Sequence, residues 1–477
     1  MIRPRVRGGR SAVAEEEHPS GRPDPRPLQA TDRDRPEDSD RDLATGTRLG
    51  MQPGLSLVGQ PGKRGVRRQA PSPEELLLEA DAWLRNEPRE TVRASRLGVD
   101  GANRPALFAM LHPAAPDVAI VGSETGRLVL SASTAAAGPG YHTFLAQLVR
   151  RLGTDLDVTW ALYDGAVETD ELLFEPPDRP SVEREMAGWL MPALQAARTA
   201  RARGADMVHL GLPAGTQFTL PGALATVMGP RDDAWLETAI RQPLTAVEVW
   251  PWWSDATDAR YLLNRALCLM WTEIRWRPPG IVDEAVLIDE VRGYLRHAHG
   301  LDPTLPYPWR EWAELLRLRG GDDPLAERIT AGARQAESGP LIGYRRGQVT
   351  AIHEGWAISV PGSFAERRGA DEWWGGEAGR GVTLAATTTG TQGGRPMPPE
   401  MFLDQVAGQI GTDAIQHRQG PVVGKARLTT DTSSGIEVAV LDGYSAVVGS
   451  GAAIKIVFDS PADWEWALET WRSLQPA

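Results

Sequence analysis

The chain has 477 residues, of which 41% are hydrophobic and 24% are charged, and this composition is typical of a globular protein with two or three domains. Its net charge of −12 argues against nucleic acid and anionic membrane surfaces as partners, because both attract a basic face. The single cysteine, Cys268, excludes an intramolecular disulfide.

The N-terminal segment predicts a disordered tail over residues 1–72. It is rich in Arg, Asp, Glu, Pro and Gly and has almost no periodic apolar positions, so it buries too little surface to offset its ordering entropy. It is either a solvated tail or a stretch upstream of a start at Met51. No apolar signal-peptide region follows residues 1–5, and no stretch reaches the ~18 apolar residues needed to span a bilayer. We therefore expect a cytoplasmic protein without a membrane partner.

An α+β domain is predicted over residues 73–330. Ser72, followed by a proline and two acids, is typical of the start of a helix. Two short apolar runs, 117–121 and 127–131, flank a glycine-containing turn and predict a β-hairpin. Further along, we expect helices at 141–152 and 181–203 and strands at 158–162 and 207–210. Together these elements predict a mixed sheet with helices.

Tryptophan dominates the aromatic residues of the second half of this domain. The chain has 17 tryptophans against 7 tyrosines and 7 phenylalanines, and eight of the tryptophans lie between Trp235 and Trp312. Helices are predicted at 255–276 and 282–299, and a third begins with Pro308 at its first position. Because tryptophan is the largest apolar side chain, we expect most of these eight to form a helical core.

A smaller antiparallel domain is predicted over residues 344–477. The apolar period changes from helical to strand-like after the Gly- and Pro-rich break at about 320–343. The predicted strands lie at 356–361, 382–387, 425–428, 436–441 and 453–458, and a helix lies at about 399–410. The closing helix has a Ser460 cap and an apolar stripe of Trp464, Leu468, Trp471 and Leu474.

This order of elements resembles the PsbP/Mog1-like α/β/α sandwich. The residues that carry the resemblance are 355–362 (Gly-Trp-Ala-Ile-Ser-Val-Pro-Gly) and 471–474 (Trp-Arg-Ser-Leu). It covers about 130 residues of the chain. Because that family consists mostly of small non-enzymatic binding domains, the resemblance implies interaction rather than catalysis.

Local motifs for catalysis are missing from the sequence. It contains neither a Gly-x-Ser-x-Gly elbow nor a His-Glu-x-x-His pair, a phosphate loop or a dinucleotide fingerprint, and no clustered arginine patch is visible in the folded region. We therefore expect no catalytic residues, no cofactor and no metal. The alternative is a hydrolase or transferase whose residues converge from distant segments, and Asp164, His142 and Glu273 are the places to look.

Three tryptophans in the C-terminal domain are candidate interaction residues. Trp373 and Trp374 are adjacent, so on a strand they point to opposite faces, and one of them is expected to be exposed. Trp466 lies off the apolar stripe of the last helix. Exposed tryptophan is enriched at binding hot spots. The sequence thus favours a non-enzymatic protein-interaction protein of chaperone-like, adaptor or immunity type, with a protein partner.

Overall fold

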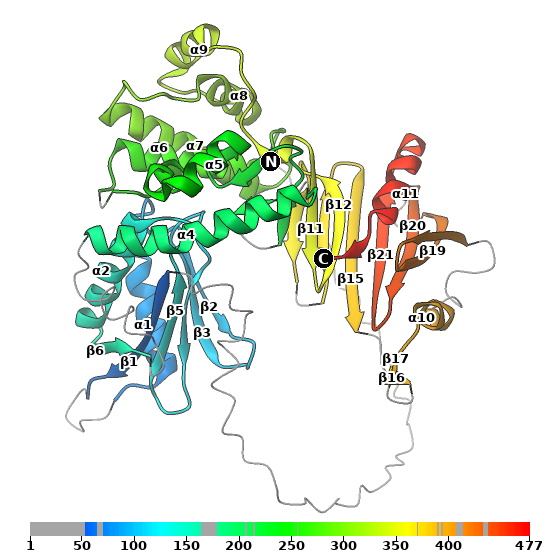
Figure 1. Cartoon of the computed structure of the whole chain (residues 1–477), viewed down its shortest axis with the longest axis horizontal. Helices are drawn as coiled ribbons and strands as arrows, with labels where there is room; N and C mark the ends of the chain where they lie inside the picture. The colour runs from blue at the N-terminus through cyan, green and yellow to red at the C-terminus, as the bar shows by residue number, and fades with distance from the viewer. Residues whose placement is uncertain are drawn as a thin grey trace, which may run out of the picture. The chain divides into compact units, whose positions relative to one another are not determined.

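The computed structural model describes residues 53–63, 70–163, 179–205, 208–212, 215–254, 256–369, 371–388, 391–392, 395–406, 414–432 and 437–477. All of these residues belong to one compact unit, which runs from Gly50 to Ala477. This unit has an α+β fold built from several mainly antiparallel sheets, as the sequence predicted (Figure 1). None of its described helices is both long enough and apolar enough to cross a membrane.

An antiparallel six-stranded sheet forms the first part of the fold, in the order β2-β3-β4-β5-β1-β6. Helices α1 (Pro73–Leu84) and α2 (Pro139–Asp155) pack against it. The predicted cap of α1 is confirmed, because the side chain of Ser72 accepts a hydrogen bond from the backbone N–H of Glu75 at 3.2 Å. The predicted hairpin is also confirmed, as β4 paired with β5. The strands are β1 (Gly54–Pro61), β2 (Ala94–Val99), β3 (Pro105–Met110), β4 (Val118–Gly122), β5 (Leu128–Ser133) and β6 (Val158–Leu162).

Strand β1 corrects the prediction that residues 1–72 lack structure. It lies between β5 and β6, where Leu57 pairs with Leu130 on one side and with Leu162 on the other. Leu55 and Leu57 are both buried. The segment alternates apolar and small or polar residues over too few positions to stand out from its Arg- and Gly-rich flanks. Its stability comes from two neighbouring strands that are distant in the sequence, so local composition could not reveal it.

The tryptophan-rich region is helical, as predicted. Trp250, Trp252 and Trp312 are fully buried, and none of the eight tryptophans between Trp235 and Trp312 is exposed. Trp309 and Trp312 stack with their ring centroids 5.5 Å apart. The helices are α4 (Arg179–Ala202), α5 (Asp233–Arg241), α6 (Ala259–Thr272), α7 (Val282–Leu301), α8 (Trp309–Arg319) and α9 (Ala326–Gln335). A small sheet of β7 (His209–Leu210), β9 (Leu224–Thr226) and β10 (Gly229–Arg231) accompanies them, with β7 parallel to β9.

Two antiparallel sheets dominate the C-terminal part. One has the order β22-β12-β11-β8, and its strand β8 (Thr216–Phe218) comes from well before the predicted break at 320–343. The other has seven strands in the order β13-β14-β15-β21-β20-β19-β18. The strands are β11 (Gln348–His353), β12 (Trp356–Pro361), β13 (Ala365–Arg368), β14 (Trp373–Glu377), β15 (Arg380–Thr388), β18 (Ile415–Gln419), β19 (Val422–Asp431), β20 (Val438–Val447), β21 (Ser450–Phe458) and β22 (Gln475–Pro476), and β16 (Thr391–Gln392) pairs with β17 (Arg395–Pro396).

Helices α10 (Pro399–Val406) and α11 (Trp464–Arg472) cover opposite faces of the seven-stranded sheet. Phe402 of α10 lies over Gly451, where a Cβ atom would come within 2.5 Å of its ring. Trp471 of α11 lies over Gly443, where a Cβ atom would come within 2.8 Å of the indole. The absence of a side chain at each glycine therefore lets a large aromatic ring approach the sheet closely.

Candidate functional site: an arginine-lined pocket

A pocket of 280 Å³ lies where the chain leaves α6, begins α7 and passes through β13. We call it the arginine pocket, because four arginines from three distant segments line it. It corrects the prediction that the folded region holds no arginine cluster. Its lining residues are Arg93, Glu273, Ile274, Arg275, Arg277, Ile281, Asp283, Glu284, Leu287, Ile288, Arg345, Ala365 and Glu366.

Two of the four arginines are fully paired with carboxylates. Arg93 donates from both terminal nitrogens to the two carboxylate oxygens of Glu273, each at 3.1 Å, and from Nε to Glu290 at 3.1 Å. Arg277 binds Glu284 in the same two-pronged way, at 2.9 and 2.8 Å, and its Nε donates to the Ser363 carbonyl at 2.8 Å. Such planar fork-to-carboxylate pairs are the strongest that arginine makes.

The third arginine, Arg345, is buried against Glu366. Its Nη1 donates to Glu366 Oε1 at 2.7 Å, and its Nε donates to the Thr272 carbonyl at 2.7 Å. The other oxygen of Glu366 accepts from the indole N–H of Trp373 at 3.2 Å. Burial by itself would raise the pKa of Glu366, but Arg345 and Arg275, with the hydrogen bonds of Arg345 and Trp373, hold it below 4.5. Glu366 is therefore an ionised carboxylate that holds Arg345 in place.

Arg275 is the arginine that lacks a close acidic partner. Its Nη1 donates to the Glu273 carbonyl at 3.2 Å, and its Nη2 lies 4.0 Å from Glu366 Oε1, outside hydrogen-bond distance. Its Nε is buried and has no hydrogen-bond partner among the described residues. Burial first, and then the neighbouring guanidinium of Arg345, lower the pKa of Arg275 to about 10. Arg275 is thus the pocket arginine whose guanidinium has neither a carboxylate within hydrogen-bond distance nor, among the described residues, an acceptor for its Nε–H.

A strained turn directs Arg275 and Arg277 into the pocket. The sequence predicted a helix to Trp276, but α6 ends at Thr272, and Trp276 has a left-handed φ of 56°. Its indole lies against Gly343, where a Cβ atom would come within 2.0 Å of Trp276 Nε1. The guanidinium of Arg346 lies 3.7 Å from the centroid of the indole. Trp276 is therefore held from two sides, and this packing maintains a backbone conformation that is unfavourable for a bulky residue.

Exposed apolar side chains also lie at the start of α7, but Val282 and Val286 are on the face of the helix opposite the pocket-lining residues Glu284 and Leu287. Ile281 is 39% exposed and also lines the pocket, while Val282 and Val286 are 77% and 54% exposed. Val282 and Val286 are four residues apart, so they lie on one face of the helix, one turn from each other. We call Ile281, Val282 and Val286 the α7 apolar face.

The structure separates the three candidate tryptophans. Trp373 and Trp374 do alternate as predicted, with Trp373 fully buried and Trp374 37% exposed. Trp373 is therefore not an exposed interaction residue. Its indole N–H instead donates a hydrogen bond to Glu366. Trp374 lies against Gly376 of its own strand, where a Cβ atom would come within 2.8 Å of the indole, and the guanidinium of Arg367 lies 6.0 Å from the centroid of its ring. Trp466 is half-buried and packs edge-on against Phe364 at 6.0 Å.

The residues of the enzymatic alternative do not form a common site. Glu273 lines the arginine pocket, but Arg93 engages both of its oxygens. His142 is fully buried, and its Nδ1 lies 3.0 Å from the Thr134 hydroxyl. Asp164 lies outside the described residues. Within the described residues, no three His, Cys, Asp or Glu side chains are placed to hold a metal ion.

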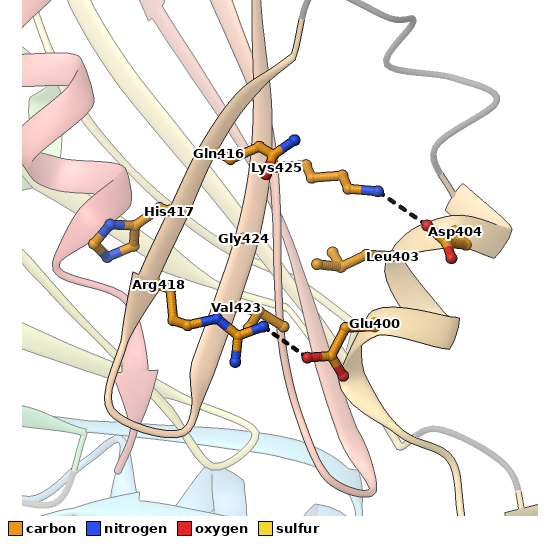
Figure 2. Close-up of a pocket in the computed structure, with 9 residues that line it drawn as sticks. All are labelled: Glu400, Leu403, Asp404, Gln416, His417, Arg418, Val423, Gly424 and Lys425. Atoms are coloured by element: carbon orange, nitrogen blue, oxygen red, sulfur yellow. Dashed lines mark hydrogen bonds and ion pairs between the residues drawn. The ribbon is translucent and has the colours of Figure 1, made fainter.

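A second hollow, of 440 Å³, lies between α10 and the strands β18 and β19 (Figure 2). Ion pairs Glu400–Arg418 and Asp404–Lys425 close its rim at 2.7 and 3.0 Å, with exposed carboxylates in both pairs. His417 lies on the other side of β18, where its ring is 5.7 Å from that of Trp471 (Figure 2). Because the charges at this rim are already paired and well solvated, the hollow offers less to a ligand than the arginine pocket does.

The sequence carried one sign of the arginine pocket that was not used. Arg275 and Arg277 flank a tryptophan at 275–277, and Arg345 and Arg346 are adjacent. Each pair is unremarkable by itself in a chain whose positive charges are almost all arginine. Only the fold brings the two pairs together with Arg93, so the cluster could not be read from spacing.

No protein-family model matches the sequence, and no curated protein matches it. Among solved structures, a crystal structure of a protein from Bacteroides thetaiotaomicron VPI-5482 is similar over 28% of this chain, with 11% sequence identity and a TM-score of 0.24. The similar region spans 49% of that protein's chain. So low a TM-score supports no inference about fold or function.

Proposed function

We propose that this protein is a non-enzymatic, cytoplasmic protein-interaction protein, and that it holds its partner at the arginine pocket and the α7 apolar face. The observation that carries the proposal is the exposure of Ile281, Val282 and Val286 at the start of α7, where Ile281 also lines the pocket that contains the incompletely paired Arg275. Chaperone-like, adaptor and immunity-type roles all fit such a surface.

The chemistry of this surface suits a protein partner. Interface centres are enriched in arginine and in large apolar residues, and they cover apolar surface that would otherwise face water. Val282 is 77% exposed, so a partner that covered it would gain from removing its apolar surface from water. The net charge of −12 makes nucleic acid and anionic membranes poor alternatives. We therefore assign the partner as a protein segment with apolar side chains and an acidic group.

The C-terminal part supports the same class of function less directly. Its seven-stranded antiparallel sheet, covered on opposite faces by α10 and α11, is compatible with the proposed PsbP/Mog1-like resemblance. Trp374 adds an exposed indole to this sheet and remains a candidate interaction residue. The enzymatic alternative has less support, because Arg93 engages both carboxylate oxygens of Glu273 and His142 is fully buried.

The proposal is tested by placing a photo-crosslinking amino acid at position 282 of the tagged full-length chain in its native cells. A matched probe at Val448, which is 66% exposed in the turn between β20 and β21, serves as the control. We expect position 282 to crosslink to a specific protein that position 448 does not capture.

The captured protein is then produced and titrated against the chain by calorimetry. Val282→Asp together with Val286→Asp should weaken binding by about tenfold or more, because each carboxylate would have to be desolvated at the interface. Val448→Asp should bind as the unaltered chain does. Equal affinity of all three proteins, or no crosslink at position 282, would show that the α7 apolar face is not the docking surface.

A further inference from the structure

We propose that the arginine pocket binds a single carboxylate group of its ligand and that Arg275 is the residue that recognises it. The identification of the ligand as part of a protein rests on the proposed function above. The carboxylate assignment itself rests on the arrangement of the side chains in the pocket.

The four guanidinium groups of the pocket differ in how closely a carboxylate approaches them. Arg93, Arg277 and Arg345 each have a carboxylate within 3.1 Å. Arg275 has only a carbonyl at 3.2 Å and a carboxylate at 4.0 Å, and its Nε is buried without a partner among the described residues. Arg275 lines the pocket and its Nη2 has no carboxylate within hydrogen-bond distance, so a ligand that supplies an acceptor to the terminal nitrogens gains a charge-assisted hydrogen bond.

The charges that line the pocket also favour a carboxylate over a phosphate. The lining carboxylates Glu273, Glu284 and Glu366 are engaged by the other three guanidinium groups. The remaining acidic group, Asp283, is exposed, so solvent screens its charge. Glu290 also pairs with Arg93, and Glu377 lies 3.8 Å from Arg277 Nε, so these carboxylates serve the other guanidinium groups. Among the described residues, Arg275 is left as the pocket arginine that has no carboxylate within hydrogen-bond distance. A carboxylate carries one negative charge, whereas a phosphate dianion would bring a second charge close to three carboxylates.

The planar shape of the Arg275 guanidinium also matches a carboxylate. The edge of a guanidinium formed by its two terminal nitrogens, Nη1 and Nη2, matches the two oxygens of a carboxylate in a planar, bidentate pair. Ile274, Ile288 and Ala365 contribute apolar lining to the same pocket. The pocket therefore fits a carboxylate attached to a short aliphatic stem, as in an acidic side chain or a chain terminus of a bound protein.

The experiment uses sodium propionate as the probe and the full-length chain, with saturation-transfer NMR of the propionate methyl group as the readout. Sodium phosphate and sodium chloride are compared at matched ionic strength. We expect propionate to bind, chloride not to displace it, and Arg275→Gln to raise its dissociation constant by about tenfold or more. Arg317→Gln is the matched control, because Arg317 is a 73% exposed arginine outside the pocket and should leave binding unchanged.

Arg275→Lys keeps the test decisive if Arg275→Gln does not fold. Lysine retains the charge but lacks the planar fork, so we expect weaker propionate binding than in the unaltered chain. Unchanged propionate binding in Arg275→Lys or Arg275→Gln would overturn the assignment, and so would phosphate binding more tightly than propionate. If a partner is captured but propionate does not bind, only the carboxylate assignment fails. If propionate binds but no partner is captured, only the proposed function fails.

Discussion

Two arginines ten positions apart, Arg265 on α6 and Arg275 just beyond it, are both largely removed from water, but they differ in what surrounds them. Arg265 is fully enclosed, and its Nη1 donates to the Leu111 carbonyl and to the Tyr261 hydroxyl, each at 2.9 Å. Its guanidinium also lies 5.3 Å from the centroid of the Tyr294 ring. Arg275 instead lies beside an open pocket.

The pKa shifts of the two arginines point in opposite directions. Burial alone would lower the pKa of Arg265, but the oxygens of Tyr261 and Tyr294 outweigh burial and raise it. For Arg275, burial and the adjacent Arg345 prevail and lower the pKa. Arg265 also has two buried nitrogens, Nε and Nη2, without a partner among the described residues, but it does not line the arginine pocket and is part of the core. Arg275, by contrast, has no carboxylate within hydrogen-bond distance to balance its charge, and it lies beside an accessible pocket. An arginine in such a position is a candidate binding group.

The largest effect is expected from Glu366→Gln, which removes the acidic partner of the pocket's buried arginines. Arg345 would lose the one carboxylate within hydrogen-bond distance of it among the described residues, and Arg368 would lose its contact with Glu366 as well, so we expect a loss of about 4 kcal/mol in the free energy of unfolding at pH 7. Chemical denaturation measures this change. Propionate should restore part of the stability, because the pocket then lacks an anion; a loss below about 1 kcal/mol would show that the pocket tolerates unpaired cations.

The pH dependence of that difference follows from the pKa of Glu366. Its pKa in the folded chain is below the ordinary 4.5, so the stability contributed by ionised Glu366 is fully present above pH 4.5 and is lost as the pH falls below it. The stability difference between Glu366→Gln and the unaltered chain should therefore shrink below pH 4.5. A difference that stays constant from pH 7 to pH 3 would contradict the role of the Glu366 charge.

A smaller effect is expected from Arg265→Ala, which tests the enclosed arginine. The change leaves a cavity and unpairs the Leu111 carbonyl, so we expect a loss of about 3 kcal/mol in the free energy of unfolding. Propionate binding should be unchanged in this variant. If Arg265→Ala loses propionate binding as well as stability, Arg265 also contributes to the pocket, and the contrast between Arg265 and Arg275 is wrong.

Trp373→Phe is expected to cost about 1–2 kcal/mol. It removes the indole N–H that donates to Glu366 and leaves a small void in a fully buried position. Trp374→Phe is the matched control on the exposed face of the same strand and should change stability little. Thermal denaturation of both variants measures the difference, and equal losses would mean that the contact between Trp373 and Glu366 contributes nothing.

The smallest effect on stability is expected from Arg275→Gln, at less than about 1 kcal/mol. Arg275 has no close ion pair to lose, and neutralising it removes repulsion with Arg345. Denaturation with and without propionate checks this prediction. A loss as large as that of Glu366→Gln would identify Arg275 as a structural residue and remove the basis of the comparison.

Much of the fold was predictable because it depends on local pattern. Ser72 and Glu75 cap α1 through contacts within one turn, and the apolar stripe of α11 is visible at Leu468 and Trp471. The alternation of Trp373 and Trp374 follows from strand geometry alone. Strand β1 was missed because its partners are distant, and the end of α6 was misplaced because Gly343 and Arg346 hold Trp276 in its left-handed conformation.

The sequence by itself determined the α+β class, the helical tryptophan core and the mostly buried role of its tryptophans, because periodicity and side-chain size act over short distances. Only the tertiary structure decided which charged groups meet. The pocket brings together residues up to 273 positions apart in the sequence, from Arg93 to Glu366. Whether a guanidinium has a carboxylate partner depends on those long-range contacts. The candidate site is therefore a property of the fold rather than of any local motif.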